Sequence, residues 1–164
     1  MKTPKILASL ALAAAIVGYT LPSFATSWLD FSQSTGSVNI TSANINSATP
    51  LNRVVVVCPA NGYLVATANA GFTYTALALP GKGWIRYSIA IDGAAPFPID
   101  PNHYRNLQDY QFAANHSSPG GMFRVDRRQQ GQQITYVFLA QRVQALTASA
   151  WQPRLAVEFF NVII

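Results

Sequence analysis

The chain has 164 residues, of which 50% are hydrophobic and only 10% are charged, with one cysteine and a formal net charge of +5. Two of the positive charges, Lys2 and Lys5, lie in an N-terminal segment that we expect to be removed, so the remaining basicity is too weak to indicate a nucleic-acid-binding protein. A single cysteine excludes an intramolecular disulfide and a structural metal site built from several thiolates. A hydrophobic core must therefore stabilise the fold.

The first 25 residues have the layout of a secretory signal peptide. Two lysines precede an apolar run over residues 6–17, which is shorter than the roughly 20 residues that a membrane-spanning helix needs. Ser23 and Ala25 supply the small residues typical of a cleavage site. We expect residues 1–25 to be cleaved, which leaves a single domain over residues 26–164, without a transmembrane segment, in a secreted, periplasmic or cell-surface location.

The rest of the chain reads as a series of strands. Short β-branched and aromatic runs alternate with Gly, Pro, Asn and Asp, and no amphipathic helical period is visible. The strongest strand, residues 54–58, ends at a Pro-Ala-Asn-Gly turn and is expected to form a hairpin with residues 63–68. Further strands are predicted over residues 28–31, 38–45, 72–79, 84–91, 122–125, 133–143 and 154–162. This all-β pattern predicts a sandwich or a closed barrel.

Two of these strands, residues 134–140 and 155–164, are apolar on both faces. Such strands are covered on two sides, whereas in a two-layer sandwich only one face meets the core. A loop or a neighbouring chain must cover the other face, and the hydrophobic composition favours a homo-oligomer. In the last strand we expect Leu155, Val157 and Phe159 to face the core and the subunit interface to be formed by Phe160, Val162 and Ile164.

Four further features have their own interpretation. Cys58 extends a four-valine strand and is expected to be buried and reduced. The charged cluster at residues 124–128 is expected to be a solvated strand end beside a turn rather than an anion-binding patch. Trp84 opens a strand and is expected in the core, whereas Trp151 lies in a turn-like segment and is available for a ligand contact such as stacking on a sugar.

Residues 94–121 are predicted to form one long ordered loop, with room for a short helix near residues 104–110. Loops on rigid sandwiches commonly carry binding residues. The aromatic side chains of this segment would equally suit a loop that folds back over an apolar sheet face, so both interpretations stay open. The expected ligand contacts are His103, Tyr104, Arg105 and Tyr110.

The sequence offers little for catalysis. Asp100, His103, Asp109 and His116 have suitable side chains, but their spacing matches no helix-borne histidine pair, calcium loop or nucleophile elbow. No catalytic residue, metal or cofactor is predicted. The sequence indicates a non-catalytic binding or structural module that acts through protein or carbohydrate contacts. A pilus or adhesin subunit is the alternative, and a hydrolase is third.

Several short motifs follow one another along the chain: a Val-rich strand followed by PANGYLV, then YSI before a DG turn, FRV, YVFLA and RLAVEFF. This order resembles secreted bacterial domains similar to the complement globular head and the tumour necrosis factor jelly roll. The resemblance covers residues 54–160 apart from the long loop. It implies an all-β, two-sheet antiparallel β-sandwich of jelly-roll type, commonly a homotrimer, that serves binding rather than catalysis. The matching positions are structural, so the resemblance assigns no functional residues.

Overall fold

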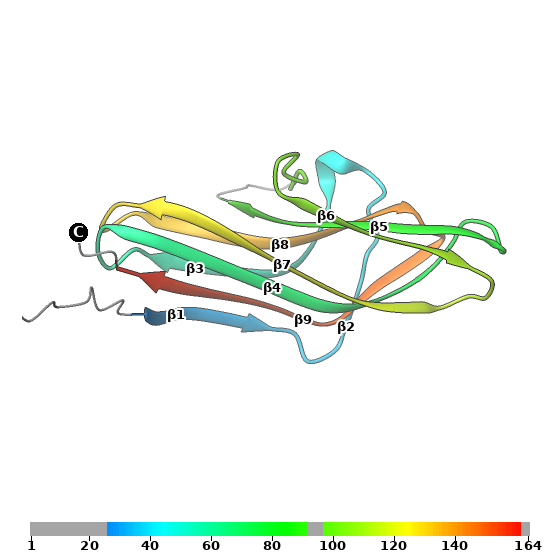
Figure 1. Ribbon diagram of the computed structural model, residues 1–164, viewed down its shortest axis with the longest axis horizontal. Coiled ribbons are helices and arrows are strands. Elements are labelled where there is room, and N and C mark those ends of the chain that lie inside the picture. The colour runs from blue at the N-terminus through cyan, green and yellow to red at the C-terminus, as the bar shows by residue number, and fades with distance from the viewer. Residues whose placement is uncertain (1–25, 92–96, 162–164) are drawn as a thin grey trace, which may run out of the picture.

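The computed structural model describes residues 26–91 and 97–161, whose strands form two antiparallel sheets packed against each other (Figure 1). The first sheet has the order β1-β9-β4-β7, with β2 also paired to β9, and the second has the order β3-β8-β5-β6. The elements are β1 (Thr26–Gln33), β2 (Ser37–Asn39), the 3-10 helix η1 (Ile45–Ser47), β3 (Thr49–Val57), β4 (Gly62–Thr75), β5 (Gly81–Ile91), β6 (Tyr104–Gln111), β7 (His116–Arg128), β8 (Gln133–Gln144) and β9 (Thr147–Phe160). The predicted all-β sandwich is confirmed. The expected signal peptide, Val162 and Ile164 lie outside the described residues.

The chain crosses repeatedly between the two sheets, as in a jelly-roll sandwich. Strands β3, β5, β6 and β8 belong to the second sheet, and β4, β7 and β9 belong to the first. The expected hairpin between residues 54–58 and 63–68 is therefore wrong, because β3 pairs with β8 while β4 pairs with β7 and β9. The reason is burial: alternate residues of both segments, such as Val56 and Leu64, face one core from opposite sheets.

The core lies between the sheets and follows the two-residue alternation of the strands. Phe72 on β4 stacks on Tyr87 of β5 with ring centroids 5.2 Å apart, and both rings meet Phe138 of β8 edge to face. Cys58 is only 1% exposed, and its thiol donates to the carbonyl of Ala60 at 3.0 Å. The prediction of a buried cysteine is confirmed.

A second, smaller apolar cluster covers the outer face of the second sheet. Val137 and Leu139 on β8 are buried there beneath Phe97 and Ile99. Residues 97–103, which we call the covering segment, are held in part by a hydrogen bond from the amide of Ala48 to the carbonyl of Phe97 at 2.7 Å. The strand β8, one of the two that are apolar on both faces, is thus covered on its outer face by a loop of its own chain.

The expectation of one long loop over residues 94–121, with a short helix in it, is wrong. After the covering segment, β6 forms the edge of the second sheet and β7 forms an edge of the first. The sequence of β6, YRNLQDYQ, is too polar to reveal a strand, because Leu107 is its only hydrophobic residue that packs against the main core. An edge strand needs little apolar alternation when most of its side chains face water.

The last strand has the predicted alternation. Leu155, Val157 and Phe159 are buried in the core, whereas Phe160 is half-buried on the opposite, outer face of the first sheet.

Candidate functional site

The structure spreads the four predicted ligand contacts over β6 and the residue before it instead of gathering them. His103 lies just before β6, with its Nδ1 3.5 Å from a carboxylate oxygen of Asp100. Tyr104 faces outward, and the neighbouring Arg105 points to the opposite face, as the alternation of a strand requires. Tyr110 lies six residues after Tyr104 on the same strand, roughly 20 Å away from it. Their role as ligand contacts stays a prediction.

The outer aromatic residues near Tyr104 are engaged within the protein. The guanidinium of Arg86 lies 4.6 Å from the ring centre of Tyr104 and 5.5 Å from that of Trp84. The Nε of Arg86 also donates to Oδ1 of Asn106 at 3.1 Å. Trp84 is therefore not in the core, contrary to expectation, because even-numbered residues at this end of β5 face outward. The guanidinium of Arg86 therefore occupies ring faces of Trp84 and Tyr104 on which a ligand would have to stack.

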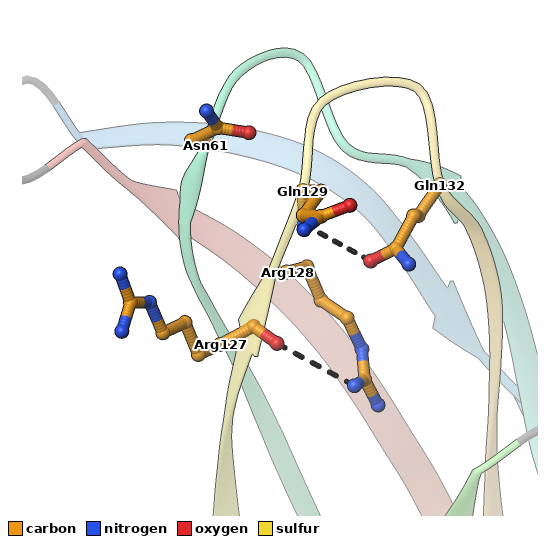
Figure 2. A pocket seen from close by; sticks show the side chains of 5 residues that line it. All are labelled: Asn61, Arg127, Arg128, Gln129 and Gln132. Carbon is orange, nitrogen blue, oxygen red and sulfur yellow. Dashed lines mark hydrogen bonds between the residues drawn. The ribbon is translucent and has the colours of Figure 1, made fainter.

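A hollow of about 600 Å³ lies at the end of the sandwich where the β3–β4 and β7–β8 turns meet (Figure 2). Figure 2 shows the two arginine side chains leaving opposite sides of β7, Arg127 on the side of Asn61 and Arg128 on the side of Gln132. Because the guanidinium groups diverge, they do not form a clamp for one small anion. The hollow is lined by Asn61, Arg127, Arg128, Gln129 and Gln132.

The charged cluster at residues 124–128 is only partly solvated. Arg127 is exposed as expected, but Arg124 points inward, where its Nη1 lies 2.7 Å from Asp100 and its Nε 3.2 Å from Asp126. Asp126 also accepts a hydrogen bond from the hydroxyl of Tyr136 at 3.2 Å. Burial, together with the adjacent carboxylate, raises the pKa of Tyr136. The solvated interpretation is wrong for Arg124, which joins elements of the fold.

A groove on the outer face of the first sheet has the features of a ligand site. Trp151 on β9 is 58% exposed, and its cross-strand partner on β4 is Gly71, which pairs in turn with Pro119 on β7. Because Gly71 has no side chain, a hollow of about 250 Å³ remains between the rings of Trp151 and Pro119. A Cβ atom added at Gly71 would come no closer than 3.9 Å to its neighbours, so the groove is open at this point.

Polar groups flank the exposed indole on both sides. On one side the hydroxyls of Thr73 and Ser117 lie 2.9 Å apart. On the other side the groove continues into a hollow of about 260 Å³, whose additional polar side chains are Asn69, Gln152 and Arg154. A sugar presents C–H groups on its ring faces and hydroxyls at its edges, so an aromatic surface bordered by donors and acceptors matches both. We call this site the Trp151 groove.

A β-bulge shapes the Trp151 groove. The register between β4 and β9 shifts between Asn69 and Gly71, and Gln152 has a positive φ of 45°. The amide of Gln152 turns away to donate to the carbonyl of Gly36 at 3.0 Å. The extra residue keeps both Trp151 and Arg154 on the outer face, and such re-aiming of side chains is a common use of bulges beside binding sites.

The sequence identified only one residue of this groove. Trp151 was expected to be available for a ligand, but Gly71 fell between two strands that are in fact one continuous strand, β4. Ser117 and Pro119 fell within the supposed long loop. A glycine inside a strand pattern was the available signal, since it often marks a place where a ligand approaches the backbone.

The described residues contain neither a candidate membrane-spanning helix nor a cluster of metal-ligating side chains. None of their helices has the length and apolar composition needed to cross a bilayer. Over the same residues, no group of three or more His, Cys, Asp and Glu side chains is arranged to hold a metal ion.

Comparison with known proteins gives little further information. No protein-family model matches the chain. No curated protein matches it either. Among solved structures, the chain is similar to the EclA C-terminal domain, described as a sugar-binding protein, with a TM-score of 0.37 and 14% identity over 87% of each chain. A likeness at this level carries no argument about family or ligand.

Proposed function

We propose that this protein is an exported, non-catalytic module that binds carbohydrate in the Trp151 groove. The observation that carries the proposal is the placement of an exposed indole opposite Gly71, with the hydroxyls of Thr73 and Ser117 on one side and Arg154 on the other. A pyranose ring stacked on the indole would bury C–H groups and leave its hydroxyls within reach of these side chains. Export rests on the sequence of residues 1–25.

The side chains of the Trp151 groove support binding rather than hydrolysis. A glycosidase generally needs two carboxylates beside the scissile bond. The described residues that line the groove include no Asp, Glu, His or Cys. The groove therefore supplies contacts and hydrogen bonds but no general acid or base, which speaks against the hydrolase alternative.

The experiment is a glycan-array screen of the exported protein, followed by calorimetric titration with the best oligosaccharide. Trp151→Ala should weaken binding at least about tenfold, because it removes the stacking surface, and Trp151→Phe should restore part of it. Gly71→Gln should also weaken binding by filling the groove, since a Cβ fits there without a clash. Val55→Ala, a change at an exposed position on the second sheet, is the control and should bind like wild type.

The proposal fails if Trp151→Ala and Gly71→Gln bind the sugar as tightly as wild type. The same titration tests the residues predicted from the sequence. If Tyr104→Ala or Tyr110→Ala abolishes binding while the groove variants retain it, the ligand site lies on β6 instead.

We also propose that the protein assembles as a homo-oligomer, with a trimer favoured by the resemblance to the tumour necrosis factor jelly roll. The support is an apolar area on the outer face of the first sheet, separate from the groove residues. Phe123 is 67% exposed there and lies in one cross-strand row with Thr67, Ala156 and the exposed Phe31. We call this area the apolar half of the first sheet: Phe31, Tyr63, Val65, Phe123, Val125 and Phe160.

An apolar surface of this kind is typical of a protein interface. The pilus-subunit alternative would require an edge strand supplied by another copy. In this structure β1 of the same chain pairs with β9 over residues 26–33, which favours association of sheet faces over strand donation.

A further inference from the structure

We propose that one end of the sandwich docks on a lipid bilayer that carries anionic headgroups. This end is formed by the β4–β5, β6–β7 and β8–β9 connections together with the adjoining end of β6. It exposes five large hydrophobic side chains, which we call the apolar tip: Leu77, Leu79, Tyr110, Phe112 and Leu146. None of the five is among the residues that line the Trp151 groove, so the inference goes beyond carbohydrate binding.

The three connections are tied to one another at the end of β4. The carbonyl of Thr75 accepts a hydrogen bond from the amide of Leu146 at 2.8 Å, and the hydroxyl of Thr75 accepts one from the amide of Asn115 at 3.0 Å. The side chain of Gln111 accepts a bond from the amide of Ala76 at 2.7 Å. The apolar tip is therefore a preorganised surface rather than a set of independent loops.

All five side chains of the apolar tip are exposed. Phe112 is 80% exposed, and its ring packs edge to face against that of Tyr110, with centroids 5.2 Å apart. Single exposed leucines are ordinary on protein surfaces, but four large apolar side chains from neighbouring connections and a fifth from the end of β6 form a patch that indicates a binding surface. No residue of the connections at 76–80, 112–115 and 145–146 is charged.

The opposite end of the sandwich has a different composition. Its turns contain Pro-Ala-Asn at residues 59–61 and Gln-Gln-Gly-Gln at residues 129–132, with no large hydrophobic residue. Since both ends are built from turns of the same sheets, the fold does not require apolar turns at one end. The apolar side chains at the tip therefore point to a partner.

The shape of this end favours a bilayer over a second protein. In Figure 1 the β4–β5 and β6–β7 connections extend beyond the sheets at the right-hand end. Protruding side chains can enter a fluid apolar phase without a matching pocket, whereas a protein interface requires a complementary surface.

Charge beside the tip is consistent with anionic headgroups. Lys82 on β5 is exposed and pairs in register with Tyr110, which places an ammonium group next to the apolar side chains. The carboxylate of Asp109, the residue before Tyr110, is engaged by the hydroxyl of Tyr74 at 2.7 Å and by Nε2 of His116 at 3.0 Å. On interfacial amphipathic helices, apolar side chains enter the headgroup boundary beside cations that attract anionic lipids, and the tip offers the same two kinds of group.

The test is co-sedimentation of the exported protein with vesicles of phosphatidylcholine alone and of phosphatidylcholine mixed with phosphatidylglycerol. Wild type should bind the mixed vesicles. Phe112→Asp and Leu77→Asp should each weaken partitioning at least about tenfold, because each replaces an inserted apolar side chain by a charge. Lys82→Gln should weaken binding to the mixed vesicles about fivefold and leave binding to phosphatidylcholine alone unchanged.

Val57→Asp is the matched control, since Val57 is an exposed aliphatic residue at the opposite end of the second sheet and should tolerate the same change without loss of vesicle binding. Thermal melting should show all four variants folded, because their side chains are exposed. Failure of wild type to bind either vesicle, or wild-type binding by Phe112→Asp, would overturn the proposal. A lower solution mass of Phe112→Asp would overturn it too, because the tip would then contact a second copy of the chain.

Discussion

Arg124 on β7 and Asp100 in the covering segment form an ion pair with 2.7 Å between Nη1 and the carboxylate oxygen. The same Nη1 lies 3.0 Å from the carbonyl of Ile89 on β5. One guanidinium therefore joins the first sheet, the second sheet and the segment that covers the outer face of the second sheet. The covering segment is fixed by charge as well as by apolar packing.

Asp100 should make the stability of the protein depend on acid pH. Burial alone would raise the pKa of Asp100, but the hydrogen bond from the amide of Asn102 and the ion pair with Arg124 outweigh it and hold that pKa below its ordinary value of 3.8. A carboxyl with a lowered pKa in the folded state stabilises the fold above its ordinary pKa, and this contribution is lost as the pH falls from 3.8 toward the lowered value.

Urea denaturation should show the wild-type protein losing stability in that pH window and the Asp100→Asn variant losing less. At neutral pH we expect Asp100→Asn to be less stable by about 1–3 kcal/mol. Equal pH profiles for the two proteins would contradict this account.

Two adjacent glycines on β7 should respond very differently to alanine. A Cβ atom at Gly120 would lie 2.7 Å from the buried ring of Phe72, whereas one at Gly121 would meet the carbonyl oxygen of Ala68 at an ordinary 3.5 Å. Gly120→Ala should cost about 1–3 kcal/mol through overpacking, and Gly121→Ala less than about 0.5 kcal/mol. Thermal melting compares them directly, and similar melting temperatures would show that the assignment of the two faces is wrong.

The faces of β9 can be separated by two further substitutions. Phe159 is buried in the core, so Phe159→Ala should lower the free energy of unfolding by about 3–5 kcal/mol. Phe160 belongs to the apolar half of the first sheet, so Phe160→Asp should mainly lower the solution mass measured by analytical ultracentrifugation. Phe123→Asp should act like Phe160→Asp. A wild-type protein that sediments as a monomer would sink the proposed assembly.

Cys58 should be chemically silent in the folded protein. Its thiol is buried and donates to the carbonyl of Ala60, so a thiol reagent can reach it only after local or global opening. Labelling of the native protein should be slow and should accelerate sharply in denaturant. Rapid labelling without denaturant would contradict the buried position.

The sequence predicted the parts of the fold that rest on local alternation. The alternation of apolar and polar residues along each strand accounts for three correct predictions. They are the opposite faces of Phe159 and Phe160, the burial of Cys58 and the coverage of β8 on both faces. Strand pairing did not follow, because β3 and β4 are neighbours in the chain but lie in different sheets, and nothing local distinguishes a hairpin from a crossing. The polar edge strand β6 was missed for a related reason, since its backbone pairing with β5 supports it without an apolar pattern.

The candidate site was less predictable than the fold. Trp151 stood out as an aromatic residue in a turn-like segment, but the groove depends on Gly71 and Pro119, which reach Trp151 only through cross-strand register. The residues predicted for ligand contact, from His103 to Tyr110, are close in sequence. The extended backbone of β6 keeps them apart in space.

The continuity of β4 fixes the geometry between the two proposed binding surfaces. Gly71 lies four residues before the end of β4, roughly 13 Å along the strand, and the connection that carries Leu77 follows directly. β4 links the groove directly to the tip, because it carries Gly71 in the middle of the first sheet and runs on into the connection that holds Leu77 and Leu79. With the tip docked as proposed, the Trp151 groove would sit at a constant height above the bilayer, within reach of short sugar chains that begin at the membrane and too low for the distal ends of long ones.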